Sequence, residues 1–286
     1  MKKIYQILEH YLSVEADFEW KDNGNLSPFL GDGVPDVRVK LLEGIRTDFR
    51  GMKSAGRQNW TEELQEPASG RWVRVLLRKG KSGLRPKAVL AEKSDDFWTV
   101  EIAETYMEYV KSGKAFTELL PLDRIANRWD AVMLHSSLIC RNGKGIAFSG
   151  PSGVGKSTQA ALWKTFENAE ILNGDRCGIR KKKQGWFGYG LPYAGSSGIY
   201  VNESTPLSAI VVLRQAEENR LRRLSKKESF SCIYRECYVM NWDREFLERH
   251  VSIIQRLVEE VPVYMLYCRP DRNSVEILKK EIEPPA

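Results

Sequence analysis

The ten-residue segment 149–158, which reads SGPSGVGKST, constrains this chain more than any other part of its sequence. It fits the pattern G-x-x-x-x-G-K-[ST]. The residues at the fixed positions are Gly150, Gly155, Lys156 and Ser157. In this pattern the glycines let successive backbone N–H groups converge on phosphate oxygens, and the lysine reaches the outer phosphates. An apolar run at 144–148 precedes the loop and a helix-forming run at 156–166 follows it, so the sequence predicts a strand, a phosphate-binding loop and a helix.

We expect this loop to bind the phosphates of ATP together with Mg²⁺. The predicted ATP-binding residues are Gly150, Pro151, Ser152, Gly153, Val154, Gly155, Lys156, Ser157 and Thr158. Ser157 is the predicted metal ligand in the loop, and Lys156 is expected to face solvent and to neutralise the phosphoryl group that is transferred. The alternative interpretation is a glycine-rich turn, capped by Ser and Thr, that binds no phosphate.

Length and composition indicate an ordinary globular chain. Its 286 residues, 42% of them hydrophobic and 29% charged, are enough for two domains. The N-terminal stretch has no uncharged apolar core and no run of about 18 apolar residues occurs, so we expect neither a signal peptide nor a membrane span, and a cytoplasmic protein. The five cysteines are scattered without metal-ligand spacing, which predicts reduced thiols.

The net charge of +6 raises the question of an anionic partner. Basic residues gather in two clusters, within 176–183 and within 220–227. Neither cluster is interleaved with aromatic side chains, and no nucleic-acid-binding motif accompanies them, so nucleic acid is the least favoured partner. A solvated face and contact with an acidic peptide or an extra phosphate are the other two interpretations.

The chain divides into two patterns near residue 128. Short apolar runs before this point predict strands within 34–42, 71–77, 86–92 and 97–102, with a long polar connection between the first two and a helix ended by Gly113. After it, Asn142-Gly143 predicts a tight hairpin that leads into the phosphate-binding loop. We therefore predict an α/β protein with a small β-rich α+β domain of unknown role at 1–127. A domain of mixed sheet with flanking helices is predicted at 128–286.

A phosphoryl-transfer site needs a carboxylate near the phosphates. The apolar strand 207–213 ends in Arg214 and Gln215 instead of an acid. Asp175, which follows the short strand ILN and a glycine, is the alternative. A strand paired beside the loop strand would bring its carboxylate to the outer phosphate, so Asp175 is the predicted catalytic residue and second metal ligand. An aspartate in an ordinary turn is the competing interpretation.

Histidine contributes one further candidate. His135, on the hairpin before the loop, is a predicted base or phosphate donor, with a structural histidine as the alternative. His10 and His250 lie in amphipathic helical patterns and are expected at the surface. The glycine-rich segment 188–198 is either a loop over the substrate or an ordinary connection.

The segment HSSLICRNGKGIAFSGPSGVGKST, followed by ILNGDR, resembles the catalytic domain of HPr kinase/phosphorylase. The resemblance covers roughly residues 128–215. It implies a core similar to that of ATP-dependent phosphoenolpyruvate carboxykinases and phosphorylation of a serine on a small protein. By position, Asp175 matches the second of two adjacent family aspartates and His135 the hairpin histidine. Gly174 replaces the first aspartate, and the family's Glu-Ile-Arg-Gly stretch is missing, so substrate recognition does not carry over.

The chain as a whole resembles a bacterial branch of HPr-kinase-related proteins associated with ribosomal-peptide maturation. This resemblance implies an ATP-dependent kinase that acts on a Ser or Thr hydroxyl of a peptide or small protein, with a ribosomal precursor peptide as one such partner. A kinase for a small metabolite and a nucleotide-sensing module without transfer activity are the alternatives. The sequence leaves assembly into homo-oligomers open.

Overall fold

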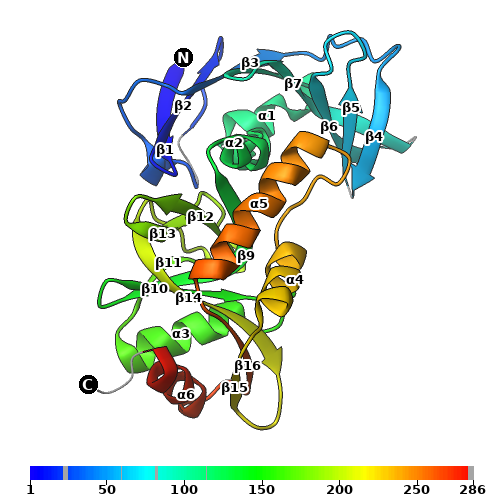
Figure 1. Ribbon diagram of the computed structural model, residues 1–286. Coiled ribbons are helices and arrows are strands. Elements are labelled where there is room, and N and C mark those ends of the chain that lie inside the picture. Colours follow the sequence, from blue (N-terminus) through cyan, green and yellow to red (C-terminus); the bar gives the residue numbers. More distant parts are fainter. Residues whose placement is uncertain (22–24, 59, 81–82, 114, 283–286) are drawn as a thin grey trace. The chain divides into compact units, whose positions relative to one another are not determined.

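The computed structural model describes residues 1–21, 25–58, 60–80, 83–113 and 115–282, and these residues form a mixed α/β fold with two mixed sheets and six α-helices (Figure 1). Backbone contacts divide the chain into two compact units, Met1–Leu122 and Asp123–Ala286. The sequence predicts its domains at 1–127 and 128–286. None of the helices in the described ranges is long and apolar enough to cross a membrane.

The first unit is built on one eight-stranded sheet with the order β1-β2-β3-β8-β7-β6-β5-β4. Its strands are β1 (Lys2–Ile7), β2 (His10–Ala16), β3 (Val37–Glu43), β4 (Lys53–Gln58), β5 (Thr61–Gln65), β6 (Trp72–Gly80), β7 (Gly83–Ser94) and β8 (Phe97–Ile102). Strand β3 pairs in parallel with β2 and β8, and the other pairs are antiparallel. Val37, Val39 and Leu41 are buried at every second position of β3, as a half-buried strand requires. Helix α1 (Glu104–Lys111) follows the sheet.

The second unit contains another eight-stranded sheet and most of the helices. Its strands are β9 (Ala131–Arg141), β10 (Lys144–Ser149), β11 (Glu170–Asn173), β12 (Arg176–Lys182), β13 (Gly185–Gly190), β14 (Ser204–Gln215), β15 (Arg220–Arg223) and β16 (Val263–Cys268). Its helices are α2 (Leu122–Arg128), α3 (Lys156–Glu167), α4 (Lys226–Glu236), α5 (Arg244–Glu260) and α6 (Arg272–Ile282).

Three strands of this second sheet are parallel neighbours. Strand β14 pairs in parallel with β10 on one side and with β16 on the other. The carboxyl ends of the three strands therefore lie at one edge of the sheet, and the predicted phosphate-binding loop leaves β10 at this edge. Strand β10 also forms the predicted hairpin with β9, where Asn142 and Gly143 have φ values of 49° and 71°.

Alternate side chains of this sheet belong to two separate hydrophobic cores. On β14, Ile210 and Val212 belong to the core that includes residues of α5, whereas Val211 and Leu213 belong to the core that includes residues of α3 and α6. The sheet is thus a middle layer between helices, with α3 and α6 side by side (Figure 1). Parallel strands covered on both faces are typical of α/β proteins.

The structure corrects three sequence-based expectations. The polar connection after residue 44 contains a hairpin, β4 with β5, which its low hydrophobicity concealed. His10 begins strand β2 after a tight turn at Leu8 and Glu9, so it does not lie on a helix. His250 lies on α5 as predicted, but only 2% of its surface is exposed because its ring stacks on Phe246.

Candidate active site

The strand–loop–helix arrangement predicted for the phosphate-binding loop is confirmed. Strand β10 ends at Ser149 and helix α3 begins at Lys156. Gly153 and Gly155 have positive φ values of 79° and 112°, which glycine adopts without strain. A Cβ atom at either position would meet no other atom within 4 Å, so the backbone there is open to a ligand. The loop therefore offers an accessible helix N-terminus suited to an anion.

Lys156 is buried, although the sequence analysis expects it to face solvent. Only 7% of its surface is exposed, and its Nζ donates hydrogen bonds to the carbonyl oxygens of Gly150 at 2.8 Å and Pro151 at 3.1 Å. Burial lowers the pKa of the ammonium group, and the nearby carboxylates of Glu236 and Asp175 oppose that shift. The Lys156 side chain is thus folded onto its own loop and is held there by two carbonyl groups.

Asp175 lies beside this loop because of a side-chain-stabilised turn. Asn173, at the end of β11, accepts hydrogen bonds on Oδ1 from the backbone N–H groups of Asp175 at 2.8 Å and Arg176 at 2.7 Å. The hydroxyl group of Ser157, in the loop, donates a hydrogen bond to the Gly174 carbonyl oxygen at 3.3 Å. The predicted carboxylate and the predicted metal-binding hydroxyl therefore belong to segments that touch each other.

The structure brings His135 to the same place. His135 lies on β9 and pairs with Arg176 on β12, and this pairing puts the histidine beside the Asp175 turn. His135 Nε2 is 3.8 Å from Asp175 Oδ1, and His135 Nδ1 is 3.4 Å from Glu236 Oε2. Burial, followed by the positive charge of Lys156, lowers the pKa of His135 against the opposing pull of the two carboxylates. The neutral imidazole is favoured, so one ring nitrogen donates and the other accepts.

Glu236 is a site residue that the sequence analysis missed. It ends helix α4, and its neighbour Cys237 forms an isolated β-bridge with Leu134, which brings the end of the helix to β9. The Glu236 side chain is 11% exposed and faces Lys156 closely enough to affect its pKa. The sequence does mark the start of α4, through the capping box of Ser225 and Glu228. It does not indicate which residues lie beside the other end of the helix, where Glu236 is.

Ser197 occupies the space beside Gly174. A Cβ atom on Gly174 would lie 1.8 Å from Ser197 Oγ. Ser197 belongs to a short 3-10 helix, Gly195–Ser197, within the glycine-rich segment. Gly195 itself packs on Asp175, since a Cβ there would lie 2.6 Å from Asp175 Cβ. This segment therefore covers the Asp175 turn and fits only small side chains at these two contacts.

The donor set of the site suits a hard divalent cation. The Ser157 hydroxyl and the Asp175 carboxylate are oxygen ligands of the kind that Mg²⁺ takes together with phosphate oxygens and water. Within the described ranges no group of three or more His, Cys, Asp and Glu side chains could hold a metal by itself. Water and phosphate oxygens would supply the remaining ligands of a Mg²⁺ ion held by Ser157 and Asp175.

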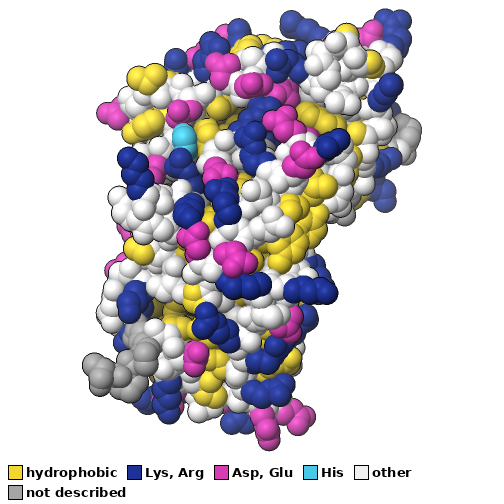
Figure 2. All heavy atoms as spheres, in the orientation of Figure 1, with side chains coloured by type: hydrophobic (Ala, Val, Ile, Leu, Met, Phe, Trp, Pro, Cys, Tyr) yellow, Lys and Arg dark blue, Asp and Glu magenta, His cyan; other side chains and the backbone are white. Residues whose placement is uncertain are grey.

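The basic clusters are partly neutralised by acidic neighbours. Lys181 pairs with Glu260, Arg222 with Glu228 at 2.9 Å, and Lys226 with Glu259 at 3.4 Å. On the face drawn in Figure 2, Lys and Arg side chains are interspersed with Asp and Glu. These pairs favour the interpretation of a solvated face over that of one continuous anion-binding surface.

Comparison with known proteins identifies one matching family. The family model described as SynChlorMet cassette protein ScmC matches residues 100–273, a range that contains the loop, Asp175, His135 and Glu236. No curated protein matches the chain. Among solved structures, the Hpr(Ser) kinase/phosphatase from Coxiella burnetii matches at 12% identity and a TM-score of 0.31, covering 52% of this chain and 87% of that chain. Similarity this low carries no argument about fold or activity.

Proposed function

The chain belongs to the family of SynChlorMet cassette protein ScmC, and we propose that it is an ATP-dependent phosphotransferase that phosphorylates a Ser or Thr hydroxyl of a peptide or small protein. One observation carries this proposal. Around Lys156 of a phosphate-binding loop, the structure gathers two carboxylates and a histidine, those of Asp175, Glu236 and His135. Phosphoryl transfer to a hydroxyl needs a positive charge that neutralises the phosphates and a group that accepts the hydroxyl proton, and these residues can provide both.

The loop binds the nucleotide phosphates in this proposal. Backbone N–H groups of the loop 150–158, in which Pro151 has none, would hold the phosphate oxygens, and Lys156 exchanges its two carbonyl partners for the outer phosphates. Ser157 and Asp175 would hold Mg²⁺, which neutralises charge on the phosphates when it is bound. Since Lys156 is already buried against the loop, only a short movement of its side chain is required.

The acceptor hydroxyl loses its proton to the pair formed by Asp175 and His135. The neutral imidazole donates a hydrogen bond from Nδ1–H to Glu236 Oε2 at 3.4 Å, which leaves the Nε2 lone pair facing Asp175 Oδ1 at 3.8 Å. The Nε2 lone pair and the Asp175 carboxylate are thus two proton acceptors that face each other, and the proton of an acceptor hydroxyl placed between them can pass to either one. Glu236 fixes the tautomer of His135 and supplies a second negative charge near Lys156.

A nucleotide-sensing module without transfer activity is the second candidate. Ser197 fills the space beside Gly174, and this favours the sensing module, because an aspartate in place of Gly174, as in the HPr kinases that the sequence resembles, has no room there. Glu236 supports the kinase instead, because it brings a second carboxylate to the site from a different element. Both candidate functions require nucleotide binding, and they differ only in whether a phosphoryl group is transferred to an acceptor.

The proposal is tested by incubating the purified chain with Mg²⁺ and γ-³²P-ATP and three sets of acceptors: Ser- and Thr-containing peptides, small alcohols, and none. We expect acid-stable label on a peptide hydroxyl. Label on a small alcohol alone would assign a metabolite kinase. Tight ATP binding without label on any acceptor would support the sensing module and overturn the kinase.

A further inference from the structure

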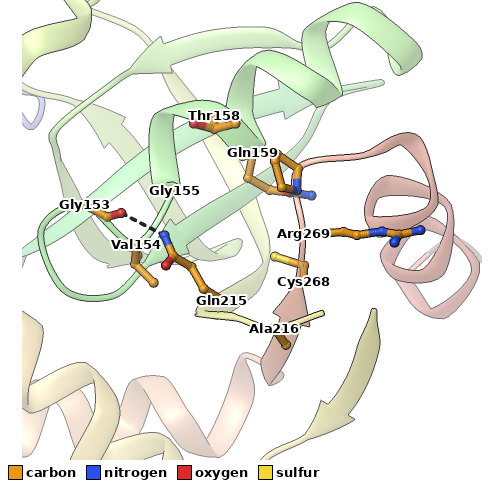
Figure 3. A pocket seen from close by; sticks show the side chains of 10 residues that line it. Gly153, Val154, Gly155, Thr158, Gln159, Gln215, Ala216, Cys268 and Arg269 are labelled. Carbon is orange, nitrogen blue, oxygen red and sulfur yellow. Dashed lines mark hydrogen bonds between the residues drawn. The ribbon is translucent and has the colours of Figure 1, made fainter. Parts of the chain in front are cut away.

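A cavity of about 280 Å³ opens beside the phosphate-binding loop, at the carboxyl edge of the parallel strands (Figure 3). Its walls come from three segments: the loop with the first turn of α3, the end of β14 and the end of β16. Ligands of open α/β sheets bind at this edge, where strands end and loops begin. The proposed function assigns only the loop's phosphate-binding groups and leaves this cavity without a role.

The walls of the cavity are mainly uncharged. Val154, Ala216, Cys268 and Pro270 provide apolar surface. Burial raises the pKa of the Cys268 thiol to about 11, so the thiol is neutral at physiological pH. The guanidinium of Arg269 pairs with Asp271. A cavity of this kind suits a flat, uncharged group better than another phosphate.

One buried polar group in the wall has an unused hydrogen-bonding atom. Gln159, on the first turn of α3, is 2% exposed, and its Oε1 accepts a hydrogen bond from Ser274 at 3.3 Å. Its Nε2 has no hydrogen-bond partner among the described residues. A buried donor without a partner costs roughly 1–3 kcal/mol, and a ligand atom that accepts its hydrogen bond removes this cost.

The cavity is continuous with the phosphate site. Gly153, Gly155 and Thr158 line the cavity and also belong to the loop that would hold the phosphates. Gln215, at the end of β14, donates a hydrogen bond from Nε2 to the Gly153 carbonyl oxygen at 3.2 Å, which ties the loop to the opposite wall (Figure 3). A molecule whose phosphates lie on the loop can therefore extend directly into the cavity.

We propose that this cavity is the nucleoside pocket, which takes the base and ribose of the nucleotide whose phosphates bind to the loop. The base lies against the apolar wall, and Gln159 Nε2 donates a hydrogen bond to a ring nitrogen or keto oxygen at its edge. This inference rests on the proposed function, since it assumes that the loop binds a nucleotide. It assigns the recognition of the nucleoside to Gln159 and to the ends of β14 and β16.

The test compares ATP with inorganic tripolyphosphate, which offers phosphates without a nucleoside, by isothermal titration calorimetry in the presence of Mg²⁺. Ala216→Trp places a large side chain in the cavity, and Gln159→Leu removes the hydrogen-bonding group. Each change should raise the Kd for ATP at least ~10-fold and change the Kd for tripolyphosphate by less than about 2-fold. Ala161→Trp, at an exposed position on α3, is the matched control and should change neither.

Two results would overturn the inference while leaving phosphate binding intact. One is a wild-type chain that binds tripolyphosphate as tightly as ATP, and the other is an equal loss of affinity for both ligands in the cavity variants. A wild-type chain that binds neither ligand would overturn the proposed function itself. Retained tripolyphosphate binding in each variant also reports that its loop is folded.

Discussion

Gly174→Asp adds a carboxylate next to Asp175, and the structure predicts how much stability this change costs. A Cβ atom there would lie 1.8 Å from Ser197 Oγ and 2.6 Å from Ser197 Cβ, whereas carbon atoms in contact are about 3.5–4.0 Å apart. Gly174 is not among the glycines with positive φ, so the backbone itself accepts a side chain. The collision with Ser197 is the obstacle.

Overpacking of this kind typically costs about 1–3 kcal/mol, which for a domain of this size lowers Tm by roughly 2–4 °C per kcal/mol. Ser197→Gly removes the collision but loses two hydrogen bonds, with the Ala194 carbonyl oxygen at 2.9 Å and the Ile199 N–H at 3.2 Å. Each is worth about 1 kcal/mol. The double variant should therefore be only as destabilised as Ser197→Gly alone.

Urea unfolding of the wild type, both single variants and the double variant gives the coupling energy. We expect the double variant to be about 1–3 kcal/mol more stable than the sum of the two single effects predicts. Ser196→Gly, at the exposed neighbouring serine, is the control and should not rescue Gly174→Asp. Additive losses in the double variant would refute the claim that Ser197 fills the space beside Gly174.

Three further predictions concern the site and its support. Glu236→Gln should lower the transfer rate at least ~10-fold and leave the Kd for ATP unchanged, because it removes the charge that orients His135. The control Glu245→Gln, on the exposed side of α5, should change neither the transfer rate nor the Kd. Lys156→Met should weaken ATP binding at least ~100-fold in calorimetry while the melting temperature stays within a few degrees, and unchanged turnover would remove the loop from the mechanism. Burial lowers the pKa of His250 to about 4 from its usual 6.5. Since the unfolded chain binds this proton first, the free energy of unfolding should decrease as the pH falls from 6.5 towards 4, by up to about 3 kcal/mol, and should not depend on His250 above pH 6.5. Denaturant unfolding of His250→Phe should lack this part of the acid sensitivity, and an identical pH profile in the variant would contradict the assignment.

Local patterns predicted the core of the site well. The loop glycines, the Asn142-Gly143 hairpin and the turn before Asp175 each depend on a few consecutive residues, and the structure has all three where the sequence predicts them. The sequence analysis expects the strand before Asp175 to pair beside the loop strand, but β11 pairs with β9, which lies between β11 and the loop strand β10. The 3.8 Å approach of His135 to Asp175 was not predicted and results from the pairing of β9 with β12.

What the sequence did not predict depends on contacts between distant segments. Glu236 reaches His135 only because α4 ends beside β9, and no residue near Glu236 signals that approach. The burial of Lys156 and His250 likewise depends on their surroundings, since both residue types are common at surfaces. Ser197 fills the space beside Gly174 from a separate segment, which the absence of an aspartate could not reveal.

The most direct test of the proposed mechanism is a paired measurement on Asp175→Asn, which keeps the size of the side chain and removes its charge. Calorimetry gives the Kd for ATP with Mg²⁺, and rapid-quench labelling with γ-³²P-ATP gives the single-turnover rate of transfer to a peptide hydroxyl. If Asp175 takes the hydroxyl proton with His135, the transfer rate at saturating ATP should fall at least ~10²-fold, a much larger change than the rise in Kd that a weaker hold on Mg²⁺ causes. A transfer rate in Asp175→Asn equal to that of the wild type would contradict the mechanism.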